Sequence, residues 1–183
     1  MIVVPNKFIF LATPRTGSQA IAAALRQVPG SVESKIHHVE PEQIDNTAEE
    51  LAPGSSTLPR YTIARDPYTQ MVSWYYHFYL RNTENVPQEE SFIQFVTERQ
   101  IHWLFGDRLN PYHEAADEVF LYEPDLQFVV QEMCDLADVF PAPVVIPKDV
   151  SPPGIGVVLT PASREAINVR YPRDVEYYYS LLG

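Results

Sequence analysis

Short apolar runs alternate with helix-like spacings of apolar residues along this chain of 183 residues. Residues 7–13, KFIFLAT, are rich in Phe and Ile, and with the apolar residues before them they predict one buried strand. Residues 20–28, AIAAALRQV, contain strong helix formers and are followed by Pro29-Gly30, which stops a helix. The chain is therefore expected to begin with a strand, a tight loop and a helix.

The same alternation continues to residue 80. Asp66 is a good N-cap and Pro67 a good first helical residue, so a helix is expected to begin there. Its apolar side chains recur at spacings near three and four. Four elements are predicted in this stretch: a short strand over 31–39, an acidic helix over 40–52, a strand over 61–64 and a helix over 67–80.

Beyond residue 90 the pattern favours helices with one further strand. We predict a helix over 91–105, a strand over 119–122 that leads into a helix, an irregular proline-rich crossing over 141–161, and a helical segment from residue 160 onward. No repeat, low-complexity tract or composition change marks a boundary, so a single domain is expected over residues 1–183.

Strands that alternate with helices indicate an α/β fold with a central parallel sheet flanked by helices. In such sheets, ligands bind beyond the carboxyl ends of the strands. Two loops follow predicted strands in this way, residues 13–18 and 64–67. These loops are where chemistry is expected.

The composition of the chain limits the classes of partner that are expected. The net charge of −11, without a Lys/Arg stripe, argues against nucleic acid as a partner. The single cysteine, Cys134, forms no intrachain disulfide and is expected to be a small buried hydrophobe. The apolar start is too short to span a membrane and lacks a basic leader, so we expect a cytoplasmic protein without a membrane span.

The first loop, ATPRTGSQA, has the composition of an anion site. A helix start offers unpaired N–H groups and a partial positive charge. Gly17 permits a close backbone approach, Thr16 and Ser18 can donate hydroxyl hydrogen bonds, and Arg15 adds a fixed charge. The loop is not a Walker A motif, because no lysine follows Gly17 and no glycine stands five residues before it. A plain strand-to-helix turn with an exposed arginine is the simpler alternative.

The second loop repeats this combination of charge and hydroxyl. Arg65 follows a predicted strand, and Ser73 lies eight residues on, near the helical face of Thr69 and Gln70. Such a pair could hold a second phosphate, although an ordinary salt bridge of Arg65 is the alternative. Two such loops favour a ligand with two separated anionic groups.

Together the two loops resemble the sulfotransferase family that uses 3′-phosphoadenosine-5′-phosphosulfate (PAPS). Its 5′-phosphosulfate loop reads approximately P-[KR]-[ST]-G-[ST], and this chain has PRTGS over 14–18. Its 3′-phosphate motif reads approximately R-[DN]-P-x₅-S-x-Y, and this chain has Arg65-Asp66-Pro67, then Ser73 and Tyr75. The run VSWYYHF is similar to the small bacterial and carbohydrate branch, such as the heparan-type 2-O-sulfotransferases. Looser similarity extends over nearly the whole chain.

The resemblance implies a P-loop-like three-layer α/β fold, PAPS as donor, PAP as product and no metal. The donor-binding residues that it implies are Pro14, Arg15, Thr16, Gly17, Ser18, Gln19, Arg65 and Ser73. Many members have lysine where this chain has Arg15. Because an arginine does not give up its proton, Arg15 is expected to act on the departing phosphate by charge alone.

Transfer of a sulfuryl group to a hydroxyl needs a base, and a histidine suits that task at neutral pH. The chain has five histidines, of which His37 and His38 lie at the end of the predicted short strand over 31–39. Family spacing favours His38, with His37 beside it. Glu40 and Glu42 are alternative bases.

We therefore predict an in-line transfer from PAPS to a hydroxyl or amine of a small-molecule or carbohydrate acceptor. A kinase-like phosphoryl transferase and a catalytically inactive PAP-binding module are the alternatives. The acceptor and the oligomeric state are not predicted from the sequence. Aromatic residues between Trp74 and Tyr79 could stack on a sugar, but core packing is the favoured interpretation.

Overall fold

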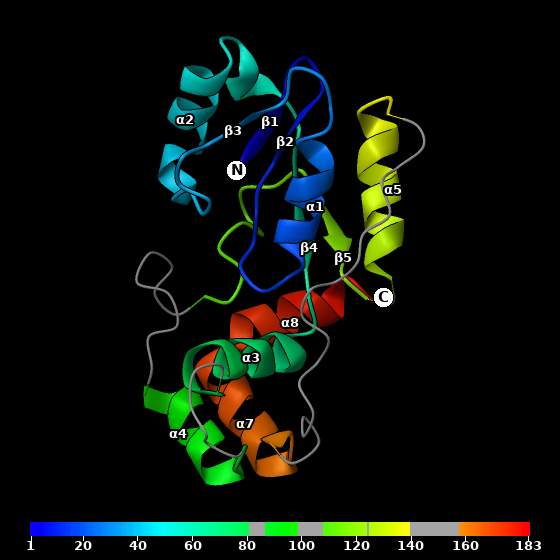
Figure 1. Cartoon of the computed structure of the whole chain (residues 1–183). Helices are drawn as coiled ribbons and strands as arrows, with labels where there is room; N and C mark the ends of the chain where they lie inside the picture. Colours follow the sequence, from blue (N-terminus) through cyan, green and yellow to red (C-terminus); the bar gives the residue numbers. More distant parts are fainter. Residues whose placement is uncertain (81–86, 99–107, 124, 140–157) are drawn as a thin grey trace. The chain divides into compact units, whose positions relative to one another are not determined.

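The structure is a computed structural model, and it describes residues 1–80, 87–98, 108–123, 125–139 and 158–183. The chain forms two compact units (Figure 1). Unit 1 comprises Met1–Ala64 and Asn110–Lys148, and unit 2 comprises Arg65–Leu109 and Asp149–Gly183. The expectation of one sulfotransferase-like domain over residues 1–183 stays a prediction.

A five-stranded sheet forms the centre of unit 1, in the order β3-β1-β2-β4-β5. Its strands are β1 (Ile2–Val4), β2 (Phe8–Phe10), β3 (Val32–Glu33), β4 (Arg60–Ala64) and β5 (Glu118–Leu121). The pairs β2–β4 and β4–β5 are parallel, whereas β1 runs antiparallel to both β2 and β3. The predicted α/β class is confirmed, and the sheet is parallel in the half that continues into the two candidate loops.

The start of the chain differs from the prediction of one strand. Val4 pairs with Phe8 across a tight antiparallel hairpin, in which the Lys7 amide donates to the Val4 carbonyl at 3.0 Å. Pro5 cannot extend a strand ladder, because it has no N–H, and Asn6 takes the left-handed φ of 60° that such a turn needs. The apolar run is therefore two strands.

Helices cover the sheet of unit 1. They are α1 (Ser18–Leu25), α2 (Ile44–Leu51) and α5 (Leu126–Leu136), with short 3₁₀ turns at Pro41–Gln43 and Ser55–Thr57. In the view of Figure 1, α1 and α5 lie on the other side of β1 and β2 from α2. This arrangement agrees with helices on both faces of the sheet.

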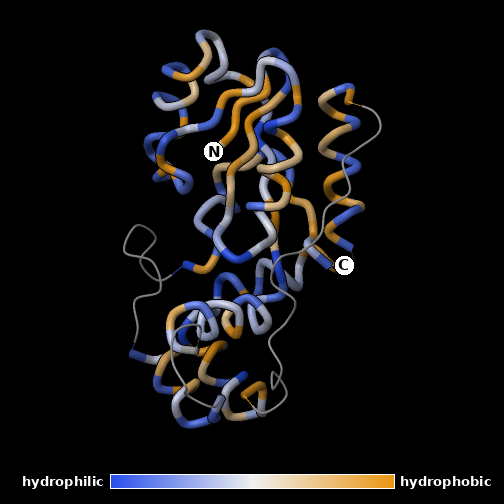
Figure 2. The backbone as a smooth tube through the Cα atoms, in the orientation of Figure 1, coloured by the Kyte–Doolittle hydropathy of each residue, from blue (hydrophilic) through white to orange (hydrophobic). Residues whose placement is uncertain are grey.

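Both faces of the strands are buried. The side chains of Ile2, Phe8 and Phe10 join α1 and α5 in one apolar cluster, whereas the alternate residues Val3 and Ile9 are equally buried outside it. Figure 2 shows β1 and β2 as hydrophobic and α5 as alternating, which is the pattern of a helix with one buried side. Cys134 is fully buried in the same cluster, as expected for a small hydrophobe.

Unit 2 is helical in its described part. It contains α3 (Pro67–Tyr75), a π-helical turn (Tyr76–Leu80), α4 (Glu89–Glu98), α7 (Pro161–Arg170) and α8 (Pro172–Ser180). The predicted C-terminal helix is broken into α7 and α8, because Pro172 lacks an N–H to continue α7 and serves instead as the first residue of α8. The predicted helix over 91–105 and the crossing over 141–161 lie partly outside the described residues.

Aromatic side chains form much of the core of unit 2. Tyr75 is 1% exposed, and its ring packs against Phe92 and Phe95 with centroids 5.2 and 5.4 Å away. Trp74 is also buried, and its ring stacks on Phe78 at 5.2 Å. Core packing is therefore the role of Trp74 and Tyr75. No helix in the described part of the chain is long and apolar enough to cross a bilayer.

Candidate functional site

The first candidate loop is a tight turn between β2 and α1. Arg15 and Gly17 both have left-handed backbone conformations, with φ of 61° and 73°. Between them, the buried Thr16 hydroxyl donates to the Thr13 carbonyl at 2.8 Å and closes the turn. A left-handed conformation at a non-glycine residue such as Arg15 is strained, and such strain is concentrated at ligand-binding turns.

Gly17 is required by packing as well as by conformation. A Cβ atom at this position would lie 2.8 Å from Cδ2 of Leu126 and 3.0 Å from Cε2 of Tyr122. These two side chains come from the start of α5 and the segment before it, so the loop is held against α5. The sequence interpretation gave Gly17 only the role of admitting a phosphate.

The donors of the loop suit an anion. The first turn of α1 begins at Ser18 and presents N–H groups that have no partner within the helix. The Ser18 hydroxyl is 4% exposed and has no hydrogen-bond partner among the described residues. Arg15, three residues before Ser18, is half-buried, and Gln19 is exposed. A set that offers donors and positive charge fits the acceptor-only oxygens of a phosphosulfate.

The Thr16 hydroxyl does not have the role expected from the sequence, which was to donate to an anion. Its hydroxyl hydrogen is used inside the turn, on the Thr13 carbonyl, and its side chain is fully buried. The hydroxyl therefore shapes the loop rather than pointing to a ligand. The place of Thr16 and of the buried Pro14 among the donor-binding residues stays a prediction.

His38 lies at the mouth of this loop. Its Nδ1 lies 2.7 Å from the carbonyl oxygen of Ala12, two residues beyond the end of β2. A carbonyl oxygen can only accept, so Nδ1 carries the proton, and in the neutral ring Nε2 is left as a base. The position follows from the sheet: two antiparallel steps through β1 make β3 run in the same direction as β2, so the residues after β3 reach the carboxyl end of β2.

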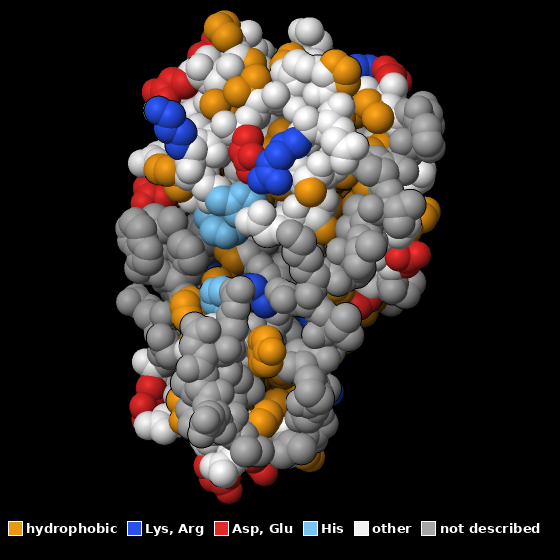
Figure 3. Space-filling model, in the orientation of Figure 1, with side chains coloured by type: hydrophobic (Ala, Val, Ile, Leu, Met, Phe, Trp, Pro, Cys, Tyr) orange, Lys and Arg blue, Asp and Glu red, His pale blue; other side chains and the backbone are white. Residues whose placement is uncertain are grey.

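His37 faces a different set of groups. Its Nδ1 lies 3.5 Å from Oε1 of Glu33, which also accepts two hydrogen bonds of 2.7 Å from Arg26. Burial lowers the pKa of His37, the nearby amino terminus lowers it further, and Glu33 opposes both. The Arg26 guanidinium holds the pKa of Glu33 below its usual value. Figure 3 shows histidine side chains at the surface beside such a basic and acidic pair. The two rings lie in edge contact, with centroids 4.6 Å apart, and of these two side chains it is His38 that is hydrogen-bonded to Ala12.

A buried polar network behind the loop was not anticipated from the sequence. Thr13 bonds to Thr62 at 2.8 Å and donates to Oδ1 of Asn110 at 3.1 Å, and all three side chains are at most 2% exposed. The Asn110 side-chain amide donates to the Ile63 carbonyl at 3.1 Å, and its Oδ1 also accepts from the Tyr112 amide at 3.0 Å. The network joins the carboxyl ends of β2 and β4.

In unit 2, the second candidate loop is organised by the start of α3. Asp66 accepts hydrogen bonds from the amides of Tyr68 and Thr69 at 2.8 and 3.0 Å and caps the helix as predicted. The Thr69 hydroxyl accepts from Nε of Arg65 at 3.2 Å, so the helix orients the guanidinium. Ser73 lies one helical turn beyond Thr69, on the same face, and is 8% exposed. The orienting role of Thr69 could have been found from its i+4 spacing to Arg65 and to Ser73.

The remaining candidates are placed as follows. Glu42 is exposed in the 3₁₀ turn Pro41–Gln43, and Glu40 precedes that turn. His77, another of the five histidines, packs against the rings of Trp74 and Phe78, with centroids 6.3 and 5.1 Å away. His102 lies outside the described residues. Within the described ranges, no group of three or more His, Cys, Asp or Glu side chains could hold a metal ion.

Comparison with known proteins finds one structural similarity to report. No protein-family model and no curated protein matches this chain. The chain is similar in structure to a sulfotransferase from Alicyclobacillus acidocaldarius, with 14% sequence identity, 98% of this chain and 96% of that chain covered, and a TM-score of 0.48. A likeness of this degree does not establish a shared family or activity.

Proposed function

We propose that this protein is a PAPS-dependent sulfotransferase in which the loop after β2 binds the 5′-phosphosulfate and His38 is the base. The observation that carries the proposal is the 2.7 Å hydrogen bond from His38 to Ala12, at the entrance of a donor-rich loop. This bond places the proton on Nδ1 and the lone pair on Nε2 of the neutral ring, next to groups suited to an anion. The PRTGS and RDP motifs support PAPS as that anion.

The 3′-phosphate of the donor is assigned to Arg65 and Ser73. Ala64 ends β4, the strand next to β2 in the sheet, and Arg65 is bonded directly to Ala64. The Thr69 hydroxyl orients the Arg65 guanidinium, which can then hold a phosphate through paired hydrogen bonds. A 3′-phosphate distinguishes PAPS from ATP, so this assignment gives the site its nucleotide specificity.

The proposed residues divide the chemistry of transfer. An acceptor oxygen bonds to sulfur, the bond from sulfur to the 5′-phosphate oxygen breaks, and the acceptor proton moves to Nε2 of His38. Arg15 and the first turn of α1 stabilise the charge that develops on the departing phosphate. The acceptor is proposed to be a hydroxyl or amine of a small molecule or carbohydrate. His37, held by Glu33, is the alternative base.

Nucleotide binding tests the donor assignment. We expect PAP to bind and to raise the melting temperature, whereas AMP, which lacks the 3′-phosphate, binds more weakly. Arg65→Ala should lower the affinity for PAP about 10–100-fold, because a hydrogen bond to a charged group contributes about 1.5–3 kcal/mol. The affinity for AMP should not change. Arg60→Ala is the matched control, since Arg60 starts the same strand and pairs with Asp45. Equal affinity for PAP and AMP would overturn the assignment.

Sulfate transfer tests the base. His38→Asn keeps an amide that can donate to Ala12 but has no basic nitrogen, so turnover should fall about 10²–10⁴-fold while PAP affinity is retained. His37→Asn should change turnover little. Arg15→Ala should lower turnover about 10²–10³-fold. Tight PAP binding without transfer to any acceptor would indicate a binding module, and Mg²⁺-dependent phosphoryl transfer would indicate the kinase-like alternative.

A further inference from the structure

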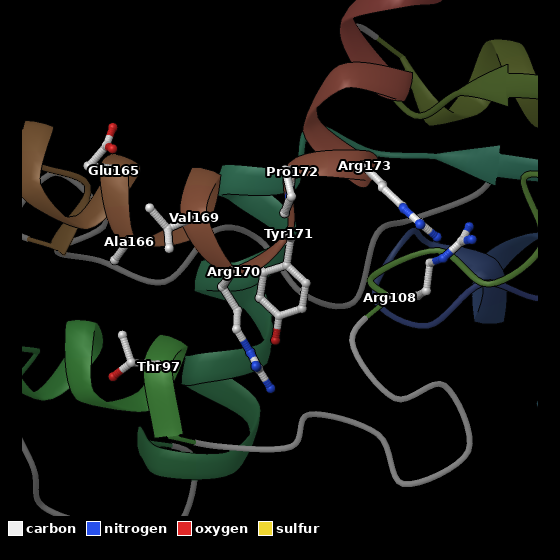
Figure 4. A pocket seen from close by; sticks show the side chains of 9 residues that line it. All are labelled: Thr97, Arg108, Glu165, Ala166, Val169, Arg170, Tyr171, Pro172 and Arg173. Atoms are coloured by element: carbon white, nitrogen blue, oxygen red, sulfur yellow. The ribbon is translucent and has the colours of Figure 1, made fainter.

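Unit 2 contains a cavity of about 870 Å³ that takes no part in the proposed donor site. Three arginines line it: Arg108, Arg170 and Arg173. They come from two distant parts of the sequence, with Arg170 and Arg173 on either side of the junction of α7 and α8. In Figure 4, Arg108 and Arg173 point toward each other at one end of the cavity. The Arg170 side chain points in a different direction, so the fold brings two guanidinium groups together at that end, with a third in the wall of the same cavity.

This concentration of positive charge runs against the composition of the chain. Acidic residues outnumber basic ones by 24 to 13, yet Glu165 is the only carboxylate among the described residues that line the cavity. Five residues of α7 separate Glu165 from Arg170, about 7.5 Å along the helix axis. Figure 4 places Glu165 at the end away from Arg108 and Arg173. Guanidinium groups brought together repel unless water or an anion lies between them, and their planar forks match carboxylate, sulfate and phosphate.

The backbone adds to the same field. Pro172 and Arg173, which start α8, lie in the cavity wall, so the positive end of that helix faces the cavity. The cap residue Tyr171 makes no side-chain hydrogen bond to the first turn. Val169 and Ala166 supply an apolar wall. Positive charge at one end and apolar surface at the other suit a small molecule with an anionic group.

The cavity is separate from the motif of Arg65. The far end of α8 packs on the start of α3, where the rings of Tyr179 and Tyr68 lie 6.4 Å apart. Arg173 precedes Tyr179 by six residues, which is about 9 Å along the helix axis. The two groups of positive charge therefore lie toward opposite ends of α8.

We propose that this cavity is a second anion site, which binds a small molecule through a carboxylate, sulfate or phosphate group. The anionic group is held between Arg173 and Arg108, and the less polar part lies along Val169. This proposal goes beyond the sulfotransferase function and does not depend on it.

Titration with inorganic sulfate, inorganic phosphate and D-glucuronate, followed by calorimetry and by NMR of the arginine side chains, tests the site. We expect Arg173→Gln to weaken the bound anion at least 10-fold, and the apolar wall to make glucuronate the tightest of the three. Arg164→Gln is the matched control, because Arg164 lies on α7 over the ring of Tyr68 and outside the cavity.

A second control separates the cavity from the donor loop. Arg15→Ala should leave the measured affinity unchanged if the anion binds in the cavity, and should abolish it if the anion binds in the loop. Equal affinities for Arg173→Gln and Arg164→Gln, or weak binding that no variant changes, would show an adventitious ion only and overturn the proposal. The PAP and AMP measurements are independent of either result.

A different observation, in unit 1, carries a second inference, which rests on the proposed function. The Tyr112 hydroxyl donates to the carbonyl of Val39 at 2.7 Å, directly after His38. The Tyr112 ring is 1% exposed, and its amide donates to Asn110, the centre of the network at the carboxyl ends of β2 and β4. Burial raises the pKa of Tyr112, so the hydroxyl keeps its proton and remains a donor.

These contacts hold His38 from both sides. Its ring is bonded to Ala12 at 2.7 Å, and the peptide that follows it is bonded to Tyr112. Asn110 ties that anchor to Thr13 at the start of the anion loop. We infer that Asn110 and Tyr112 are positioning residues, which keep the base in register with the loop.

Tyr112→Phe removes only the hydroxyl and tests this inference. We expect turnover to fall about 10-fold with unchanged PAP affinity, since displacement of a catalytic group by a fraction of an ångström lowers the rate strongly. Tyr75→Phe is the matched control, because the Tyr75 hydroxyl bonds to Ser91 at 2.7 Å in unit 2 and its ring is equally buried.

Two readouts distinguish positioning from general stability. In a His38→Asn background, Tyr112→Phe should cause no further loss of turnover, because the two changes act on one step. Nitrogen NMR of His38 should show a smaller population protonated at Nδ1 in Tyr112→Phe than in Tyr75→Phe, and this measurement needs no activity. An equal rate loss in both backgrounds, or an unchanged tautomer, would overturn the inference even where PAP binding and transfer are established.

Discussion

Gly17 shows how one residue meets two demands. Its φ of 73° is a conformation that side chains disfavour, and the space where a Cβ would lie is filled by Leu126. The turn that is proposed to bind the 5′-phosphosulfate is therefore also the place where the loop packs on α5. A substitution here affects stability and ligand binding together.

Gly17→Ala should lower the free energy of unfolding by about 1–3 kcal/mol, from left-handed strain and the clash with Leu126. It should also lower the affinity for PAP. Gly54→Ala is the control, because Gly54 has a φ of 85° but nothing within 4 Å of the added Cβ, so it carries only the conformational cost. Urea denaturation of the two variants gives the comparison, and an equal loss would show that the contact with Leu126 is unimportant.

The lowered pKa of His37 leads us to expect that the stability of the protein depends on pH. Because burial lowers its folded pKa below the ordinary value of 6.5, the unfolded chain binds more protons just below that pH. The free energy of unfolding should therefore fall as the pH drops through the ordinary histidine range toward the folded pKa. Denaturation at several pH values should show a flatter profile for His37→Gln than for the wild type. His77→Gln is the control, and an unchanged profile in His37→Gln would contradict the prediction.

At the scale of the element, the start of α3 combines a structural cap with Arg65, a proposed binding group. Asp66 satisfies two amides of the first turn, and Arg65 is oriented by Thr69 of the same turn. The segment Asp66-Pro67 predicted this helix start correctly, since the cap and the proline are local signals. A change in the cap should therefore reach the guanidinium.

Asp66→Ala should lower the free energy of unfolding by about 1 kcal/mol, the usual loss for an N-cap, and should weaken PAP as well. Thr160→Ala is the control, because Thr160 caps α7 through the Ser163 amide at 3.2 Å and α7 carries no proposed donor residue. We expect similar stability losses by urea denaturation and a loss of PAP affinity only for Asp66→Ala. Unchanged PAP affinity in Asp66→Ala would separate the cap from the site.

The predicted elements failed where long-range pairing decides the structure. The apolar start formed two strands because the Pro5-Asn6 turn allows β1 to pair with β2, and the predicted strand over 31–39 shrank to Val32–Glu33 at the sheet edge. Residues 34–39 leave the strand conformation while Ser34 and His37 still bond to Met1, and the His38 ring lies against Ala12. Local hydrophobic patterns do not contain these choices.

At the scale of the whole molecule, the proposed donor residues belong to both compact units. The loop from Thr13 to Gln19 is in unit 1, whereas Arg65 and Ser73 are in unit 2. PAP carries one phosphate for each group of residues. Its binding is therefore expected to leave a trace in both units.

Hydrogen exchange tests this expectation. Saturating PAP should protect amides at the start of α1 and at the start of α3, because both groups bind the same molecule. An inorganic phosphate ion that binds one protein molecule should protect either the start of α1 or the start of α3, but not both. In Arg65→Ala, PAP should no longer protect the start of α3. Protection confined to one unit with saturating PAP would contradict a donor that contacts both.

The sequence alone determined the α/β class, the two candidate anion-binding motifs and the cap of α3, because each depends on residues that are close together in the chain. Tertiary structure decided which histidine reaches the loop, since His38 meets Ala12 only after β3 pairs with β1. It also decided the arginine-lined cavity and the buried network of Asn110 and Tyr112, in which Thr13 and Asn110 lie 97 residues apart. Contacts of that length depend on the pairing of strands and the packing of helices, which no local pattern encodes.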